Sequence, residues 1–579
     1  MTAYDMVIRG GTVVDGSGTD PFEADVAIAG GKIAAVGARL GAGRQEIDAR
    51  GRIVTPGFVD IHTHYDGHVT WENRLQPSCY HGITTVVTGN CGVGFAPCRP
   101  QDHDDLIRMM AGVEDIPELV MAQGLPWNWE SFADYLNAID ARQHDMDIAA
   151  HIPHSALRLY AMGQRALDDE PASLADVALM AQLTEEAMRA GAIGFATSRG
   201  IHQRSTDGHS IPSVQADEAE LHGIGAAIAR SGGGVFQLLS DFRFGIEEEI
   251  GLMRRIVERS GCPLSFTLHQ RRSQPEAWRQ VLGLLASANA DGLPIRGQVI
   301  GRPSGVLLGF ELSWNPFITC PSFAPIAELP FDRRIAALRD PDLRATLIAE
   351  EPVRDGKPGM FDTVSLTRTW DHLFALGDPP DYEPDPSTSL AARAARMGIT
   401  PAELAYDLLV QGDGRSLLFL AAQDYEYGDL EVCRQLIEDP NTILGLGDAG
   451  AHCGIVCDAS YSTWMLTHWT RDRKRGPKMP LAAAVRALTS ETAEAVGFRD
   501  RGRIAAGYKA DLNVIDYGAL RLGQPHAAYT LPGGGKRIIQ HAHGFDATIV
   551  AGEITYRDGQ PTEALPGKLV RGPQAAPMA

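Results

Sequence analysis

The chain has 579 residues, of which 44% are hydrophobic, and its 62 glycines and 35 prolines are typical of a loop-rich globular protein with one large and one smaller domain. Its 52 basic and 73 acidic residues give a net charge of −21, which excludes nucleic acid and anionic membranes as expected partners because both would be repelled. No apolar run approaches the ~20 residues that span a bilayer, the first ten residues lack a signal-peptide pattern, and the eight cysteines form no CxxC pair, so we expect a cytoplasmic protein with reduced thiols.

Both ends of the chain are rich in short β-strands. In the first fifty residues, strands are predicted at 6–9, 12–15, 25–29 and 32–36, with glycine pairs between some of them. The same texture returns near the C-terminus, at 511–516, 547–550 and 553–557. We therefore expect residues 1–57 and 497–579 to form one small β-sandwich domain with a structural role.

The middle of the chain, residues 58–496, alternates short apolar runs with helical patterns, as βα units on a parallel sheet do. Helices are predicted at 174–189, with Ser173 as N-cap, and at 218–230. Two insertions, 96–145 and 302–441, are expected to shape a substrate pocket, and either is a candidate lid. Eight strands are predicted, the number that closes a (β/α)₈ TIM-type barrel: 58–64, 84–88, 147–152, 192–197, 235–240, 264–269, 295–300 and 442–448.

The clearest chemical signal is Asp60-Ile61-His62-Thr63-His64, which follows the turn Thr55-Pro56-Gly57. Because residues i and i+2 of a strand point to the same face, His62 and His64 can present two imidazoles to one metal ion. They lie at the C-terminal end of the first predicted barrel strand, where barrel enzymes carry their active sites. The alternative is a pair of unrelated core histidines.

Longer motifs resemble the amidohydrolase superfamily. The segments VIRGGTVVDG and TPGFVDIHTH resemble the start of an amidohydrolase barrel, and RGRIAAGYKADLNVID, at 501–516, resembles the return of the chain to the sheet domain. Four further segments resemble one branch of that superfamily, the N-acyl-D-amino-acid deacylases (D-aminoacylases). They are HGITTVVTGNCG, WNWESFADYL, AHIPHSALRLYAMG and GAIGFATSR. These motifs fall in the family's order over nearly the whole chain.

The resemblance implies a zinc enzyme with a cysteine ligand and one zinc per chain, or two with the second held weakly. Cys91, in Gly-Asn-Cys-Gly, stands at the matching position, and a thiolate is a good zinc ligand. The chain has no lysine between Lys32 and Lys357, which agrees, because other amidohydrolases bridge two metals with a carboxylated lysine. The alternative for Cys91 is a small, buried apolar residue.

Asp448 ends the eighth predicted strand. The resemblance gives it two tasks, which are to contact the metal and to take the proton from the attacking water. His452 lies four residues later, and His154 follows the third strand. Both are candidates to stabilise an oxyanion or to orient the substrate, with purely structural roles as the alternative.

The fifth and sixth strands depart from the family's pattern, in which each commonly supplies a further metal-binding histidine. The fifth strand has Gln237 and Ser240 instead, and His269 on the sixth falls one residue out of register, which turns a strand side chain to the other face. His269 is therefore a candidate ligand or an idle residue. The favoured hypothesis is a single zinc held by His62, His64, Cys91 and Asp448. The alternatives are that the site binds metal weakly, or that the chain is a non-catalytic relative that kept the barrel.

The resemblance also implies basic residues that grip a substrate carboxylate. Arg199, Arg271 and Arg302 are candidates, since arginine binds carboxylates bidentately, with ordinary ion pairs as the alternative. We therefore expect a zinc-dependent amidohydrolase that cleaves a non-peptide amide C–N bond, in an N-acyl D-amino acid or a similar small-molecule amide, through a zinc-activated water. The alternatives are a cyclic-amide hydrolase or deaminase on the same barrel, or a non-catalytic scaffold, and a homo-oligomer is left open.

Overall fold

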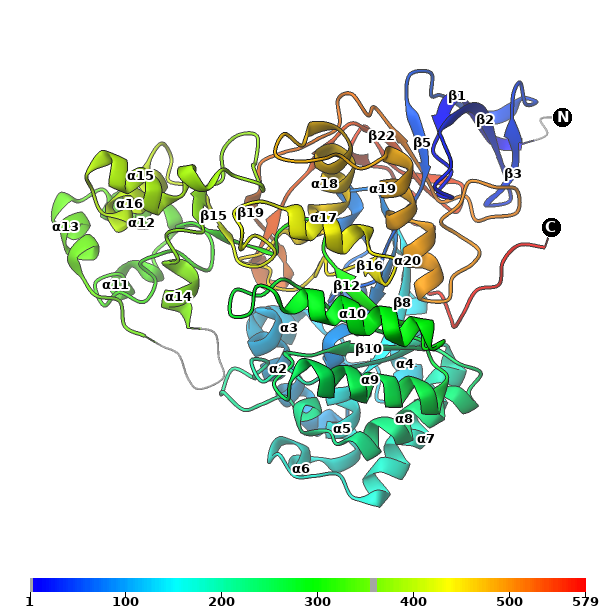
Figure 1. Ribbon diagram of the computed structural model, residues 1–579, viewed down its shortest axis with the longest axis horizontal. Helices are drawn as coiled ribbons and strands as arrows, with labels where there is room; N and C mark the ends of the chain where they lie inside the picture. The colour runs from blue at the N-terminus through cyan, green and yellow to red at the C-terminus, as the bar shows by residue number, and fades with distance from the viewer. Residues whose placement is uncertain (1–3, 355–361, 579) are drawn as a thin grey trace.

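The computed structural model describes residues 4–354 and 362–578, and its central element is a sheet of eight parallel strands (Figure 1). The strands follow one another in chain order, and all eight of the predicted strands are present, so the prediction of a (β/α)₈ barrel is confirmed. Every residue of β7 and β8 is buried, as in strands covered on both faces. The strands are β6 (Phe58–Asp60), β7 (Ile83–Thr88), β8 (Asp147–Pro153), β9 (Gly194–Ser198), β10 (Val235–Leu239), β11 (Leu264–Thr267), β12 (Ile295–Val299) and β16 (Thr442–Leu444).

The barrel closes just beyond the C-terminal ends of its first and last strands, β6 and β16. Thr63 and Ala449 form a parallel bridge there. The backbone N–H of His64 donates to the carbonyl of Ala449 over 2.8 Å, and the N–H of Asp448 donates to the carbonyl of His62 over 3.2 Å. Barrel closure itself therefore brings the two halves of the candidate site together, although they are almost four hundred residues apart in the sequence.

Helices cover the outside of the barrel (Figure 1). The predicted helix at 174–189 is α7, and the hydroxyl of its N-cap Ser173 accepts a hydrogen bond from the backbone N–H of Asp176. The predicted helix at 218–230 is α8. The main outer helices are α5 (His154–Met162), α7 (Leu174–Ala190), α8 (Glu218–Arg230), α9 (Ile246–Ser260), α10 (Ala277–Ala290), α17 (Glu431–Glu438), α19 (Leu481–Leu488) and α20 (Ser490–Ala495).

A separate β-sheet domain is built from both ends of the chain, as the sequence predicts. Its nine strands include five from the N-terminal segment and four from the C-terminal segment, and it has its own buried core. The exact domain boundaries, 1–57 and 497–579, stay a prediction. The strands are β1 (Tyr4–Val13), β2 (Phe22–Ala29), β3 (Lys32–Gly37), β4 (Gly43–Asp48), β5 (Ile53–Pro56), β17 (Leu512–Ile515), β22 (Phe545–Val550), β23 (Glu553–Arg557) and β24 (Gln560–Pro561).

The two insertions differ in how they pack. The first carries α2 (His103–Glu114), α3 (Glu118–Gly124) and α4 (Phe132–Asp140), whose apolar side chains belong to the main core of the barrel. The second forms a lobe at the left of Figure 1 with its own hydrophobic cluster. That lobe contains β13 (Gly305–Leu308), β14 (Leu373–Ala375), β15 (Leu418–Ala421), α11 (Ala324–Ala327), α12 (Phe331–Leu338), α13 (Pro341–Ala349), α14 (Thr363–Thr367), α15 (Leu390–Met397) and α16 (Pro401–Val410).

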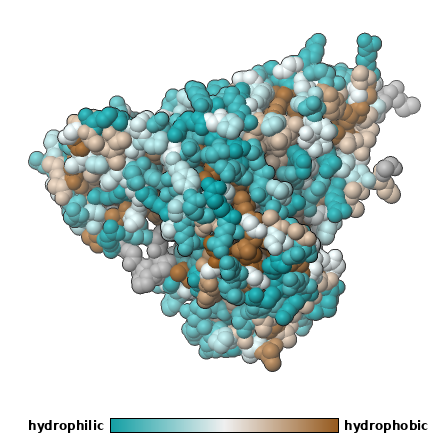
Figure 2. Space-filling view, in the orientation of Figure 1, coloured by the Kyte–Doolittle hydropathy of each residue, from teal (hydrophilic) through white to brown (hydrophobic). Residues whose placement is uncertain are grey.

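The face shown in Figure 2 is mostly hydrophilic, with apolar side chains gathered near its centre, where Figure 1 draws α9 and α10, and in further patches at its upper right. Within residues 4–354 and 362–578, no helix has the length and apolar character needed to cross a membrane.

A buried ion cluster joins the barrel to the C-terminal segment of the chain. Asp147, at the start of β8, is 2% exposed, and its Oδ2 accepts hydrogen bonds from Arg501 Nη1 and Lys509 Nζ, each over 2.6 Å. Arg501 is 4% exposed and also donates to the hydroxyl of Thr85 over 3.0 Å. Removal of one partner would leave charge that is buried and only partly compensated.

We expect Arg501→Met to lower the free energy of unfolding by about 3 kcal/mol, near the lower end of the range for a broken buried pair because Lys509 still compensates Asp147. The matched control is Arg503→Met, since Arg503 forms an exposed pair with Glu494 and should cost at most about 1 kcal/mol. Denaturant unfolding of both variants checks this. Equal midpoints for the two variants would contradict it.

Candidate metal centre

Two histidines lie side by side just past the end of β6. His62 and His64 are 1% and 2% exposed, and their ring centroids are 5.4 Å apart. The hydroxyl of Thr63, between them, donates instead to the backbone carbonyl of Val87 in β7 over 2.8 Å. The alternation of side chains along this segment therefore places both imidazoles together, as the HxH spacing predicts.

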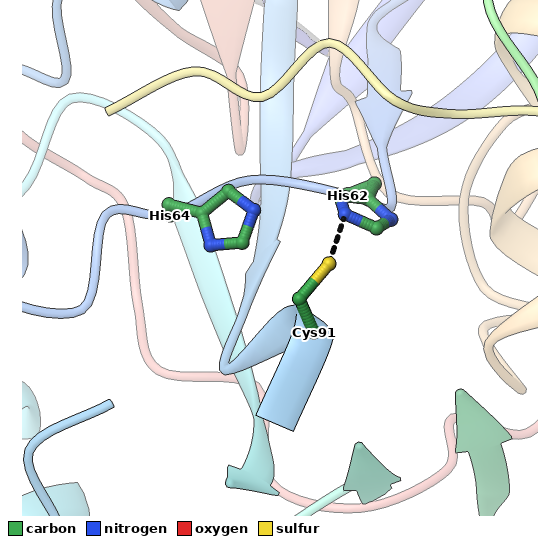
Figure 3. A group of neighbouring side chains, drawn as sticks. All are labelled: His62, His64 and Cys91. Atoms are coloured by element: carbon green, nitrogen blue, oxygen red, sulfur yellow. Dashed lines mark hydrogen bonds between the residues drawn. The ribbon is translucent and has the colours of Figure 1, made fainter. Parts of the chain in front are cut away.

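Cys91 reaches these histidines from the turn that follows β7. Its own φ is +54°, and Gly89 just before it has φ +82°, where an added Cβ would lie 2.2 Å from the carbonyl oxygen of His151. This turn places Cys91 Sγ 3.3 Å from His62 Nε2, the contact drawn in Figure 3. Within the described part of the chain, one group of three or more histidine, cysteine, aspartate or glutamate side chains has all its ligand atoms within 4.8 Å of one another. This group is His62, His64 and Cys91.

Asp448 approaches the two histidines from the segment that follows β16, the last barrel strand. Its Oδ1 lies 3.4 Å from His62 Nε2 and 3.6 Å from His64 Nε2. Burial alone would raise the pKa of Asp448, but the hydrogen bond from His64 outweighs it and lowers the pKa below its ordinary value. Its side chain is 32% exposed, so the carboxylate that contacts both histidines is also accessible to solvent.

The donor set fits a zinc ion. Imidazole, thiolate and carboxylate are the ligands that zinc takes in proteins, and three or four of them complete a site. Burial raises the pKa of the Cys91 thiol to about 11 and lowers the pKa of His62 to about 4, so at neutral pH both groups are uncharged when no cation is bound. Binding of zinc would therefore displace the thiol proton.

Each histidine has a polar side chain behind it. Gln298 on β12 places its Oε1 2.6 Å from His62 Nδ1. Glu114, the last residue of α2, places its Oε1 3.4 Å from His64 Nδ1, and burial raises the pKa of this carboxyl to about 7. Neither residue was predicted from the sequence. Gln298 carried a usable signal, as a glutamine within a predicted barrel strand, whereas Glu114 lies in an insertion without a motif.

The candidate side chains from the fifth and sixth strands lie outside the group of His62, His64 and Cys91. The Oε1 of Gln237 accepts a hydrogen bond from the backbone N–H of Cys91 over 2.9 Å, and its Nε2 is buried without a partner. Ser240 donates to Glu249 over 3.0 Å. His269 lies outside the compact group, with its Nδ1 2.7 Å from Asp424 Oδ2. Burial lowers the pKa of His269, but Asp424 outweighs this and raises it.

The two other candidate histidines differ in their freedom to act. His154 is fully buried, and both ring nitrogens are engaged, with Thr197 and Glu220, each at 2.7 Å. His452 has a 34% exposed side chain that lies 3.8 Å from Glu114, and burial lowers its pKa to about 4. A donor role for His154 would require its pairs to open, whereas His452 is available as a neutral imidazole. Both roles stay predictions.

The three candidate arginines also differ. Arg199 is paired with Glu249 over 3.0 Å, and Arg302 is buried against Asp458. The guanidinium of Arg271 donates to the backbone carbonyl of Asp241 and stacks over the ring of Phe242 at 5.1 Å. Among residues 4–354 and 362–578, no carboxylate lies within 4.0 Å of it. Arg271 is therefore the candidate whose charge a substrate could still neutralise.

The fold and the site together define a barrel protein with a buried His-His-Cys group and an adjacent aspartate at the C-terminal ends of its strands. The model of the Amidohydrolase family matches residues 45–556. The chain therefore belongs to the amidohydrolase family, and metal-dependent amide hydrolysis is the coarse activity that this membership supports.

Individual relatives agree with this assignment. An uncharacterised protein of Mycobacterium tuberculosis is 30% identical over 96% of this chain and 92% of its own length. A D-aminoacylase of Alcaligenes xylosoxydans xylosoxydans is 27% identical over 89% of this chain and 88% of its own. The fold is similar to that of the N-acyl-D-glutamate deacylase of Bordetella bronchiseptica, solved with zinc and a phosphonate inhibitor, at a TM-score of 0.63 and 22% identity over 98% of this chain and 99% of that one. The resemblance to the D-aminoacylase branch is confirmed.

Proposed function

We propose that this chain is a zinc-dependent hydrolase that cleaves the amide bond of an N-acyl amino acid, with D-configured amino acids as the first candidates. The observation that carries the proposal is the convergence of His62, His64 and Cys91 within 4.8 Å, with Asp448 against both histidines. The similarity to a D-aminoacylase, and to an N-acyl-D-glutamate deacylase solved with zinc, supports the choice of metal and substrate class.

The residues of the centre divide into holding and proton-transfer roles. His62, His64 and Cys91 are almost wholly buried and would hold the cation, together with Asp448. Zinc bound there supplies a Lewis acid that polarises a carbonyl and lowers the pKa of water toward ~7. Asp448, ionised and partly exposed, accepts a proton from the attacking water and returns it to the leaving nitrogen. His452 is our candidate donor to the oxyanion.

We propose one zinc per chain. The fifth strand offers Gln237, whose oxygen is already bound to the backbone of Cys91. His269 is held by Asp424 and lies outside the compact group. A second zinc, bound weakly with help from His269, is the alternative, and metal titration followed by elemental analysis distinguishes one equivalent from two.

Arg271 is our candidate for recognition of the substrate carboxylate. It lies two residues after His269, beyond the C-terminal end of β11. Barrel enzymes bind their substrates at this end of the strands. Its guanidinium has no carboxylate partner among the described residues, unlike Arg199 and Arg302. An N-acyl amino acid carries a carboxylate, which a guanidinium without a carboxylate partner can bind.

Activity on a panel of N-acyl D- and L-amino acids, measured together with bound zinc, tests the proposed function. Release of free amino acid by zinc-loaded protein supports it. Ring-opened acid from cyclic amides, or ammonia, would replace it with the cyclic-amide hydrolase or the deaminase. Failure to bind zinc would favour the non-catalytic scaffold.

We expect Arg271→Met to raise KM for an N-acetyl amino acid by ~10–100-fold, because charge-assisted hydrogen bonds to the carboxylate are lost. KM for the methyl ester of the same compound should hardly change, since the ester lacks the charge. The matched control is Arg272→Met, because the neighbouring Arg272 forms an exposed pair with Asp371. Equal effects on acid and ester would contradict a carboxylate clamp at Arg271.

A further inference from the structure

Gln298 links three strands of the barrel at the base of the candidate metal centre. It lies on β12, is 2% exposed, and pairs with Thr267 of β11 on one side and Ile443 of β16 on the other. Its Nε2 donates to the hydroxyl of Ser265 over 2.9 Å, and its Oε1 lies 2.6 Å from His62 Nδ1. Both ends of the amide are thus engaged inside the barrel.

The contacts of His62 require different roles for its two ring nitrogens. Its Nε2 faces the centre, 3.3 Å from Cys91 Sγ and 3.4 Å from Asp448 Oδ1. A ring nitrogen can bind a cation only through a lone pair, so Nε2 must carry no proton when the metal is bound. In a neutral imidazole the proton then resides on Nδ1, which needs an acceptor, and Gln298 Oε1 is the acceptor within reach.

We propose that Gln298, anchored by Ser265, is a positioning residue that holds the proton of His62 on Nδ1 and so keeps Nε2 free for the metal. This inference concerns the tautomer of His62 and rests on the proposed metal centre for its role in function. The partner behind a metal-bound histidine fixes ring orientation and tautomer in this way.

An amide has one advantage over a carboxylate at this position. The centre already collects the acidic groups of Cys91, Asp448 and Glu114 around the two histidines. A glutamine accepts the Nδ1–H bond without adding a further negative charge to this buried group.

The test combines the tautomer in metal-free protein with zinc affinity. Histidine-selective ¹⁵N NMR, with the His62 signal assigned by its loss in His62→Gln, should show Nδ1–H in the wild type and loss of that preference in Gln298→Met. Competition with a chelator should show zinc binding weakened by ~10–100-fold in Gln298→Met and restored to within a few-fold in Gln298→Glu, which again offers an acceptor. Ser265→Ala should fall between Gln298→Met and the wild type.

Gln540→Met is the matched control, because Gln540 is also fully buried with both amide atoms bonded, to Tyr382 and the carbonyl of Gly523, away from the centre. It should leave zinc affinity unchanged, even where melting temperature falls. Nε2–H in the metal-free wild type, or wild-type zinc affinity in a folded Gln298→Met variant, would overturn the inference. A wild type with the Nδ1–H tautomer that binds no zinc would refute the proposed function and leave the tautomer assignment supported.

Discussion

Replacement of Cys91 by alanine is expected to weaken zinc binding by more than ~100-fold and to abolish hydrolysis at limiting zinc, because a direct ligand contributes more than the 10–100-fold typical of the partners behind ligands. Cys91 Sγ lies 3.3 Å from His62 Nε2 and is 4% exposed, so water cannot readily replace it. Elemental analysis and chelator competition measure the affinity. Cobalt substitution adds an independent sign, since a sulfur-to-cobalt charge-transfer band should be present in the wild type and absent in Cys91→Ala.

Cys98→Ala is the matched control for this experiment. Cys98 lies in the same segment after β7 and is 1% exposed, but its Sγ donates to the carbonyl of Arg99 and takes no part in the metal-binding group. It should keep full zinc content and the charge-transfer band. If Cys91→Ala bound zinc as tightly as Cys98→Ala, Cys91 would not be a ligand and the candidate centre would be wrong.

Replacement of Asp448 by asparagine is expected to lower kcat by ~10²–10⁴-fold, the usual contribution of a positioned acid–base group. The amide is nearly isosteric with the carboxylate but cannot accept the proton of the attacking water. Zinc content should fall far less than in Cys91→Ala, because the amide oxygen of asparagine can still bind the cation and His62, His64 and Cys91 remain within 4.8 Å of one another. Steady-state kinetics and elemental analysis on the same preparation separate loss of chemistry from loss of metal.

Asp413→Asn serves as the control for Asp448→Asn, since Asp413 is exposed and forms an ion pair with Arg415. It should change neither kcat nor zinc content. Full activity in Asp448→Asn would remove the proposed proton acceptor, whereas a loss of zinc as large as in Cys91→Ala would leave Asp448 with a holding role alone.

Several features of this protein could be predicted because they depend on short stretches of chain. The eight barrel strands follow from local apolar runs, and α7 follows from its periodicity and from Ser173 at its start. The approach of His62 and His64 follows from the two-residue period of an extended chain. The position of Cys91 was obtained in a different way, through the resemblance of its motif to a family.

What lies around these residues could not be predicted, because it depends on which distant segments the fold brings into contact. Glu114 stands behind His64 from an insertion, and Gln298 reaches His62 across 236 positions of sequence. The ion pairs of two candidate site residues could not be predicted either. Nothing in the sequence near Arg199 or His154 indicates that they pair with Glu249 and Glu220. The sequence by itself determined the barrel and the pairing of the two imidazoles, and its resemblance to a family suggested the other candidate ligands. The tertiary structure decided which charges are already compensated and which tautomer the site supports, because a side chain's charge partner and hydrogen-bond acceptor are set by contacts between strands and loops that only barrel closure brings together.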